Sequence, residues 1–402
     1  MIAGLDVGTY KVGVVVAEVA EGRVDVTGVG TAISTGLRKG IVINIDATVD
    51  AIRQAVGEAE LMAGCEIRNV IVSAGGTHLK GLNSHGVVPV RSREVTKSDV
   101  DRVVEAARAV ALPTDREVLH LLPQEFVVDD QDGIKQPVGM MGVRLEARVH
   151  IVTGGIGSGK NLIKCCNRAG LHVDELLGAP LACAEAVLAP EERELGVALL
   201  DLGAGTTSLL VVYGGAVRHS AVLPLGSGYV TSDLAAYLRT PLAEAETLKI
   251  RHGTASAIGA SPELTVEVPG IGGRAPQRLS PRALAEVIEP RVFETLRMAR
   301  DEVARAGCAG LLTSGVVLTG GGSLLHGITD LAERVFRGPV RLGAPAALTG
   351  LVDAVASPMY ATGVGLVLHG KKQHDRPVTG RGSMTHVGRI GQRLVDLIRD
   401  FF

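Results

Sequence analysis

Aromatic residues are scarce in this 402-residue chain: they make up 2% of it, and tryptophan is absent. Its cores must therefore rest on valine, isoleucine, leucine and alanine. The sequence also lacks a run of about 18 consecutive apolar residues, which excludes a spanning helix. The start of the chain carries Asp6 and has no basic region followed by a long apolar stretch, so it is not a secretory signal. These absences predict a cytoplasmic protein.

An excess of charge is lacking too. The chain has 41 Lys+Arg against 43 Asp+Glu, and this balance argues against a nucleic-acid partner. The five cysteines show no CxxC pair and no metal-ligand spacing, so we expect reduced thiols rather than disulfides or a zinc site. The 46% hydrophobic fraction and the 52 glycines fit a globular α/β protein with many tight turns.

What the sequence does contain is an internal repeat. Residues 4–18 read GLDVGTYKVGVVVAE, and residues 199–213 read LLDLGAGTTSLLVVY. In each copy an apolar strand ends in Asp-x-Gly, small residues follow, and a second apolar strand begins. Such a repeat predicts two related α/β halves that face each other across a cleft.

The turns of the repeat carry the chemistry of a phosphate site. Glycines let the backbone approach an oxygen-rich ligand, and consecutive N–H groups form an anion cradle. One such hairpin alone would be an ordinary glycine turn, but two copies in the same order favour phosphate binding. The residues concerned are Gly8, Thr9 and Lys11 in the first copy and Gly203, Gly205, Thr206 and Thr207 in the second. Asp6 and Asp201, at the strand ends, suit Mg²⁺ held largely through water.

A third glycine-rich turn follows an apolar strand near residue 320. It reads LTGGGSLL (residues 318–325) and includes Gly320, Gly321, Gly322 and Ser323. Alone this signal is weak. After two phosphate hairpins, it predicts a loop that lies against a flat ligand or a diphosphate.

One further stretch, TGGIGSGKNL (residues 153–162), looks like a P-loop. A true P-loop ends in Lys followed by Ser or Thr, whose hydroxyl binds Mg²⁺, whereas Asn161 follows Lys160 here. Because the chain already supplies a complete set of phosphate turns, we expect that this stretch does not bind a nucleotide. Two helices are also expected, over residues 46–64 and over 96–112, the latter capped by Thr96 or Ser98.

Together the two hairpins and the later glycine loop resemble the actin/Hsp70 nucleotide-binding fold. Several stretches, nearly end to end, are more specifically similar to the FtsA family of bacterial cell-division proteins. They are HLLPQEF, PVGMMGVRLEARVHIVTG, LDLGAGTTSL, AEAETLKIRHG, LAEVIEPR, GVVLTGGGSLLHG and PMYATGVGLVLHG. The resemblance implies an α/β, actin-like fold of duplicated ribonuclease-H-like βββαβα halves around a nucleotide cleft, with a small α+β module inserted in the first half.

The resemblance also implies a division of the chain into segments. The first half comprises residues 1–79 and 160–193, with the inserted module at 80–159. The second half comprises 194–228 and 308–369, with a helical module at 229–307. A flexible linker at 370–384 and an amphipathic helix at 385–402 would complete the chain.

For the site, the resemblance implies ATP and Mg²⁺ as ligands. Gly226 and Gly228 would approach the phosphates, and Glu246 and Lys249 would reach the ribose and adenine, unless that pair is only a surface ion pair. Actin-like ATPases that hydrolyse well usually place Glu or Gln before the proline where Gly178 and Ala179 stand here. We therefore expect at most a weak ATPase, with Asp233 as a weak stand-in for the catalytic group.

The C-terminal residues predict a membrane-bound helix. At about 100° per residue, the apolar side chains fall within roughly 140° of arc, opposite arginines and aspartates, behind a basic linker. These apolar residues are Val387, Ile390, Leu394, Leu397, Ile398, Phe401 and Phe402. The amphipathic helix would lie on an anionic membrane surface rather than cross it. The alternative is a helix that docks on another protein or forms a dimer.

The family's partner is FtsZ, whose acidic C-terminal peptide would bind the helical module. Of its arginines we favour Arg291 and Arg297. The inserted module would contact later division proteins such as FtsN, and neighbouring copies would form filaments on the inner membrane face at the septum. Two alternatives stay open, an actin-fold kinase for a sugar or acetate and an MreB-like filament protein.

Overall fold

The computed structural model describes residues 1–20, 22–258, 265–272, 275–346 and 348–375. The predicted amphipathic helix, residues 385–402, lies outside the described residues, as does most of the predicted linker. Within the described part of the chain no helix is both long and apolar enough to cross a bilayer. All five cysteines are free thiols.

The first half is built on a six-stranded sheet in the order β11-β6-β1-β2-β3-β19. Its strands are β1 (Ile2–Val7), β2 (Lys11–Ala20), β3 (Arg23–Ile33), β6 (Asn69–Ala74), β11 (His172–Gly178) and β19 (Thr349–Gly350). The first three strands form an antiparallel meander, and β6 and β11 extend it in parallel. The valine-rich run of β2 is buried on both faces, as expected for a sheet covered by helices on both sides.

One face of this sheet is covered by α1 (Ile45–Ala63) and α3 (Ile156–Arg168). Helix α1 begins after Asn44, whose side chain accepts a hydrogen bond from the Ala47 N–H, and ends at Gly64, whose φ of 66° stops the helix. The predicted helix over residues 46–64 is thus confirmed. A short ribbon of β4 (Leu37–Arg38) and β5 (Ile41–Val42) precedes it.

The second half repeats the same strand order. Its five-stranded sheet is ordered β14-β13-β12-β17-β18, with the antiparallel meander first and the two parallel strands after it. The strands are β12 (Val197–Leu202), β13 (Thr207–Tyr213), β14 (Ala216–Leu223), β17 (Val316–Thr319) and β18 (Val340–Leu342). The predicted duplication is therefore confirmed: all five strands of this sheet have a counterpart in the first sheet, which has β19 in addition.

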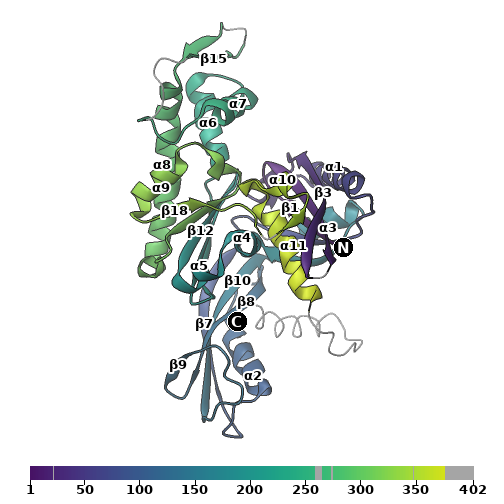
Figure 1. Cartoon of the computed structure of the whole chain (residues 1–402), viewed down its shortest axis with the longest axis vertical. Coiled ribbons are helices and arrows are strands. Elements are labelled where there is room, and N and C mark those ends of the chain that lie inside the picture. Colours follow the sequence, from purple (N-terminus) through teal and green to yellow (C-terminus); the bar gives the residue numbers. More distant parts are fainter. Residues whose placement is uncertain (21, 259–264, 273–274, 347, 376–402) are drawn as a thin grey trace.

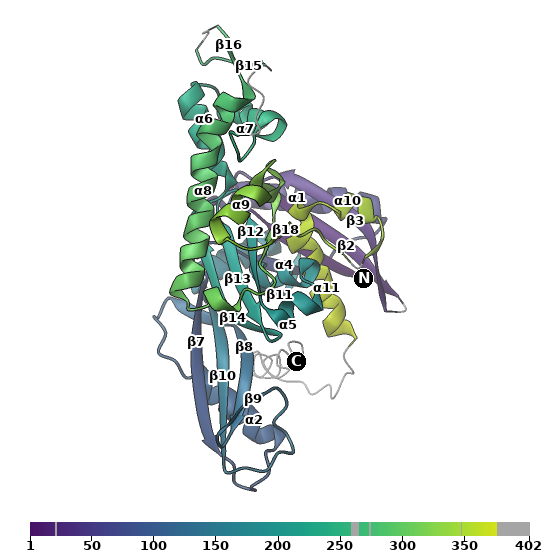
Figure 2. The same cartoon turned by 60° about the vertical axis from the view of Figure 1, so that its left-hand side comes forward.

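The inserted module is a separate four-stranded antiparallel sheet in the order β7-β10-β8-β9, with one helix packed on it. Its elements are β7 (Lys80–Pro89), α2 (Lys97–Arg108), β8 (Arg116–Val128), β9 (Gln131–Ile134) and β10 (Arg144–Gly155). Thr96, rather than Ser98, caps α2, and it forms a capping box with Asp99. The module lies at one end of the molecule (Figures 1 and 2).

The helical module occupies the opposite end, as both views show (Figures 1 and 2). It consists of α6 (Ser227–Leu238), α7 (Leu242–His252), the hairpin of β15 (Val266–Val268) and β16 (Gln277–Leu279), and the long α8 (Pro281–Arg305). Ser280 caps α8 and Pro281 occupies its first turn, where a missing N–H costs nothing. Helix α9 (Ile328–Phe336) joins α8 in the core beneath the second sheet.

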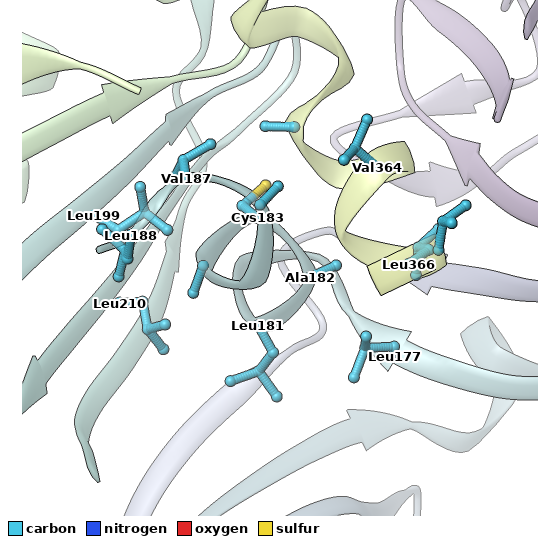
Figure 3. Packing of buried hydrophobic residues seen from close by; sticks show 14 of the residues in the cluster. Leu177, Leu181, Ala182, Cys183, Val187, Leu188, Leu199, Leu210, Val364 and Leu366 are labelled. Atoms are coloured by element: carbon cyan, nitrogen blue, oxygen red, sulfur yellow. The ribbon is translucent and has the colours of Figure 1, made fainter. Parts of the chain in front are cut away.

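Two helices lie between the sheets and join the halves. They are α4 (Ala179–Val187) and α11 (Ala361–His374), whose apolar side chains share one core with both sheets (Figure 3). At their crossing, a Cβ on Gly365 would lie 1.8 Å from the Ala182 carbonyl oxygen, so only glycine fits there. The remaining α-helices of the described residues are α5 (Pro190–Leu195) and α10 (Val352–Val355), and short 3-10 helices span Ala309–Leu311, Gly321–Leu324 and Pro358–Tyr360.

This path of the chain corrects three predicted boundaries. Strand β19 pairs with β3, and α11 packs on β1 and β2, so residues 349–369 belong to the first half rather than the second. Helix α3 begins at Ile156 and packs on α1, so the inserted module ends near residue 155 rather than 159. Residues 370–374 are the last turns of α11 and not linker, because Lys372 is held by Glu185 and Gln373 contacts His369.

Candidate nucleotide-binding site

A cavity of about 680 Å³ lies between the two halves. Its walls contain sixteen of the seventeen residues predicted from the sequence to bind nucleotide: Asp6, Gly8, Thr9, Lys11, Asp201, Gly203, Gly205, Thr206, Thr207, Gly226, Gly228, Glu246, Lys249, Gly320, Gly321 and Gly322. The exception is Ser323, which is buried and donates its hydroxyl to the Gly320 carbonyl at 2.7 Å. Ser323 therefore supports the glycine loop from behind.

The two Asp-x-Gly turns have the same local structure. The Gly8 N–H donates to the Lys11 carbonyl at 3.0 Å, and the Gly203 N–H donates to the Thr206 carbonyl at the same distance. The turns also approach each other closely, since a Cβ on Gly205 would lie 2.6 Å from Thr9 Oγ1. The cavity is thus closed at this point by the contact between the two halves.

The start of α6 is tied to the second turn. The Ser227 N–H donates to the Gly203 carbonyl at 2.8 Å, and the Gly228 N–H donates to the Ala204 carbonyl at 2.9 Å. A Cβ on Gly226 would lie 2.5 Å from the Ala204 carbonyl oxygen. Glycine at 226 is therefore required for the packing of α6 on the turn, in addition to its place in the cavity wall.

Asp6 and Asp201 place two carboxyl groups in the cavity wall. Burial raises the pKa of Asp6, although the hydrogen bond from Ser73 and the charge of Lys11 oppose this. Burial, and then the charge of Asp6, raise the pKa of Asp201 to about 7. A divalent cation would stabilise the charged form of both buried carboxyl groups. No group of three or more His, Cys, Asp or Glu side chains that could hold a metal ion occurs among the described residues.

Lys11 supplies a buried cation at the same wall. Its Nζ has no hydrogen-bond partner among the described residues, and burial lowers the pKa of Lys11 against the opposing charge of Asp6. A buried donor without a partner is costly, and an anionic oxygen in the cavity would satisfy it. The polar groups of the cavity wall, two carboxyl groups and one ammonium beside two glycine-rich turns, fit a magnesium–phosphate ligand.

Glu246 and Lys249 lie on one face of α7, at the second half's side of the cavity. Lys249 Nζ is 2.7 Å from Glu246 Oε2 and 2.9 Å from Thr231 Oγ1. The side chain of Glu246 is only 21% exposed, and that of Lys249 is only 11% exposed. The two residues do form an ion pair, but in the cavity wall rather than on the outer surface, where a ligand's hydroxyl groups could reach it.

Sequence reasoning missed Ser73. Its hydroxyl donates to Asp6 Oδ1 at 2.7 Å and accepts from the Val7 N–H at 3.3 Å, so it fixes the first carboxylate. The repeat contains the signal that could have found it. VIVSAGG (residues 70–76) is the first-half counterpart of VVLTGGG (residues 316–322), with Ser73 where the second copy has Thr319.

Other predicted residues lie elsewhere. Asp233 does not line the cavity, and its carboxylate is bound by Arg291, with Nε to Oδ2 at 2.6 Å. This position removes Asp233 as a catalytic stand-in. Arg291 is half-buried by that contact, whereas Arg297 is exposed on α8. Ala179 does line the cavity, at the start of α4, and offers no polar atom from its side chain.

The P-loop-like stretch is not part of this cavity. Residues 153–155 end β10, and Lys160 lies within α3, which packs against α1. Neither Lys160 nor Asn161 lines the cavity. The start of α3 instead lines a small neighbouring cavity, through Gly155, Ser158 and Gly159.

Comparison with solved structures agrees with the duplicated fold. The structure resembles the PilM–PilN type IV pilus biogenesis complex, with a TM-score of 0.67 at 19% identity over 92% of this chain and 98% of that one. It also resembles MreB5 of Spiroplasma citri bound to AMPPNP, with a TM-score of 0.56 at 14% identity over 93% and 96% of the chains. The architecture is therefore that of the actin-like ATPases, with a small domain inserted in the first half.

Sequence comparison is more specific. The model of the SHS2 domain inserted in FtsA matches residues 76–153, and the model of cell division protein FtsA matches residues 198–365. The chain is 48% identical to cell division protein FtsA of Pseudomonas aeruginosa over 93% of this chain and 90% of that protein. It is 42% identical to FtsA of Escherichia coli K12 over 93% and 91%. With its duplicated sheets, its inserted module and this similarity over nearly its whole length, the chain belongs to the FtsA family of cell-division proteins.

Proposed function

We propose that this protein binds ATP between its halves, polymerises on the inner face of the cell membrane and anchors FtsZ filaments there. The observation that carries the proposal is the cavity whose walls join the phosphate turns of both halves and the Gly320–Gly322 loop. The MreB5 neighbours, whose structures contain ADP and AMPPNP, support a nucleotide in the same fold.

Within the cavity, Asp6 and Asp201 would hold Mg²⁺ through water, and Lys11 and the turn N–H groups would hold the phosphates. Mg²⁺ bound there would supply charge neutralisation at the phosphates. Glu246 and Lys249 would contact the ribose and adenine. Because Gly178 and Ala179 offer no side chain to orient a water, hydrolysis would be slow.

The helical module would bind the acidic C-terminal peptide of FtsZ. Arg297 is exposed on α8, and Arg291 lies nearby between Asp233 and Glu294. An acidic peptide would take over Arg291 from these two carboxylates, and Arg is suited to such exchange because its planar fork binds carboxylates in pairs. The inserted module, at the far end of the molecule, would contact later division proteins such as FtsN and neighbouring subunits.

The C-terminal residues would hold the protein on the membrane as a peripheral protein at the division septum. In the helix predicted from the sequence, Leu394, Leu397 and Phe401 would lie on the apolar face, with arginines opposite. One short amphipathic helix binds weakly and reversibly, so filaments of many subunits would supply the avidity.

Flotation of FtsZ with liposomes tests the tether. FtsZ, ATP and anionic vesicles would be mixed with the full chain or with a chain stopped before Thr385. We expect FtsZ to float only with the full chain. Leu397→Asp, on the apolar face, should behave like the truncation, whereas Asp396→Asn, on the opposite face, should behave like the full chain. If the full chain binds ATP but does not float FtsZ, the tethering function is wrong and the C-terminal helix docks elsewhere.

A further inference from the structure

The Lys11 ammonium lies on an aromatic ring rather than in a hydrogen bond. Its Nζ is 3.7 Å from the centre of the Tyr360 ring, and it has no hydrogen-bond partner among the described residues. A cation over the face of an aromatic ring is attracted by the ring's quadrupole. The ring therefore partly replaces the water that Lys11 loses on burial.

Tyr360 is the less mobile of the two partners. Its N–H donates to the Ser357 carbonyl at 3.0 Å, and its ring packs against the core shared by the two halves. The preceding Pro358 carbonyl accepts from the Gly320 N–H at 3.2 Å and from Thr319 Oγ1 at 3.3 Å. Lys11, in contrast, has a flexible four-carbon stem. Any change in this contact would therefore come from movement of the lysine.

In the proposed binding mode, Lys11 would lie at the phosphate end of the nucleotide. Glu246 and Lys249, on the side proposed for the sugar, belong to the second half, whereas Lys11 extends from the first turn beside Asp6 in the first half. A ligand that spans the cavity from the sugar side would bring its outermost phosphate to Lys11. An ammonium forms stronger contacts with an anionic oxygen than with an aromatic ring, because the oxygen carries formal charge.

We propose that Tyr360 is the resting partner of Lys11 and that the terminal phosphate of ATP displaces it. This inference rests on the proposed function, and it adds a positioning residue that sets the preference for ATP over ADP. In the empty and ADP-bound states Lys11 lies on Tyr360. In the ATP-bound state Lys11 leaves the ring for the terminal phosphate. The lysine–ring contact thus opposes the binding of ATP but not the binding of ADP.

The consequence can be measured as a ratio of two dissociation constants, that for ADP over that for ATP. Tyr360→Leu removes the ring, so the ratio should rise by about 5- to 30-fold, the range that a partly desolvated cation–π contact implies. Tyr360→Phe keeps the ring and should keep the wild-type ratio. In a Lys11→Met background, Tyr360→Leu should leave the ratio unchanged. Tyr213→Leu is the matched control, because it removes the remote pair with Arg218, 5.7 Å from the Tyr213 ring.

A second measurement needs no substitution at Tyr360. With lysines labelled at Cε and the Lys11 signal identified by its loss in Lys11→Met, the ring current of Tyr360 should shift that signal in the empty and ADP-bound protein. A non-hydrolysable ATP analogue should remove the shift. This readout decides the matter even if Tyr360→Leu does not fold.

Three results would overturn the inference: an unchanged or lower ratio in a folded Tyr360→Leu protein, a Tyr360→Phe protein that behaves like Tyr360→Leu, or a Lys11 signal that is the same with ADP and with the ATP analogue. If the wild-type protein binds ATP and one of these is found, only the role of Tyr360 is wrong. If the wild-type protein binds neither nucleotide, the proposed function fails and the inference fails with it.

Discussion

His150 Nε2 lies 2.7 Å from Ser220 Oγ, and this contact joins the inserted module to β14 of the second half. The other ring nitrogen, Nδ1, is 2.6 Å from Asn83 Oδ1. The ring is fully buried between the two sheets, and this burial lowers the pKa of His150 to about 3. The junction therefore depends on a histidine that stays neutral in the folded protein.

This burial predicts a loss of stability in mild acid. An unfolded histidine binds a proton below about pH 6.5, whereas His150 resists protonation until about pH 3 when folded. The stabilising contribution is therefore complete above pH 6.5 and decreases as the pH falls towards 3. The free energy of unfolding, measured with urea, should decrease from pH 7.5 to pH 5.5 in the wild type. In His150→Gln this decrease should be smaller by about 1 kcal/mol. His172→Gln, at a side chain 73% exposed, is the control. Equal losses in wild type and His150→Gln would contradict this account.

The second prediction separates the cavity from the P-loop-like stretch. A side chain on Gly321 would extend into open space in the cavity wall, so Gly321→Val should occupy the ligand's volume and weaken ATP binding at least 10-fold, roughly one to two kcal/mol. Lys160→Ala, in α3, should leave ATP affinity unchanged. Titration with a fluorescent ATP analogue measures both. Loss of binding in Lys160→Ala with full binding in Gly321→Val would mean that the nucleotide site is misplaced.

The third prediction concerns the ion pair of Arg291 and Asp233. If Arg291 binds the acidic FtsZ peptide, Arg291→Glu should reduce peptide affinity at least 10-fold, about 1.4 kcal/mol, at low salt. The charge-swapped pair Arg291→Glu with Asp233→Arg rebuilds the internal ion pair and should restore stability. Fluorescence anisotropy with the FtsZ peptide measures the affinity, and thermal unfolding measures the stability.

The swapped protein decides between two roles for Arg291. If it is stable and binds the peptide as well as the wild type does, Arg291 holds α6 and α8 together and does not bind FtsZ. Arg297→Glu serves as the companion variant, because Arg297 is exposed and its replacement should change binding without changing stability.

The fourth prediction is slow turnover. Ala179 is buried in the cavity wall and cannot orient a water, so ATP hydrolysis by the purified protein should be slower than about 1 per second, the lower end of typical enzyme rates. Ala179→Gln introduces an amide at that wall and should raise the rate, whereas Ala179→Leu adds similar bulk without a polar atom and should not. Phosphate release measures all three proteins. A wild-type rate of tens per second would show that another group activates the water.

Local patterns in the sequence account for much of the fold and most of the cavity wall. The strand–turn–strand repeat around Asp6 and Asp201 predicts the two sheets, because an apolar run closed by Asp-x-Gly forms the same hairpin wherever it occurs. The same two turns line the cavity, so much of its wall follows from their local structure. Even Ser73, which was missed, has a counterpart in the repeat at Thr319.

Only the tertiary structure decides which distant side chains meet. Tyr360 reaches Lys11, Arg291 binds Asp233, and α11 returns to the first half, yet nothing in the residues around each of these positions indicates its partner. Such contacts depend on how helices pack across the two sheets, and that packing is set by the shapes of many buried side chains together. The sequence by itself determines the two halves and their phosphate turns, because those are local. The resting place of the lysine, the loss of Asp233 as a catalytic candidate and the histidine junction are decided by long-range packing, which has no local signature.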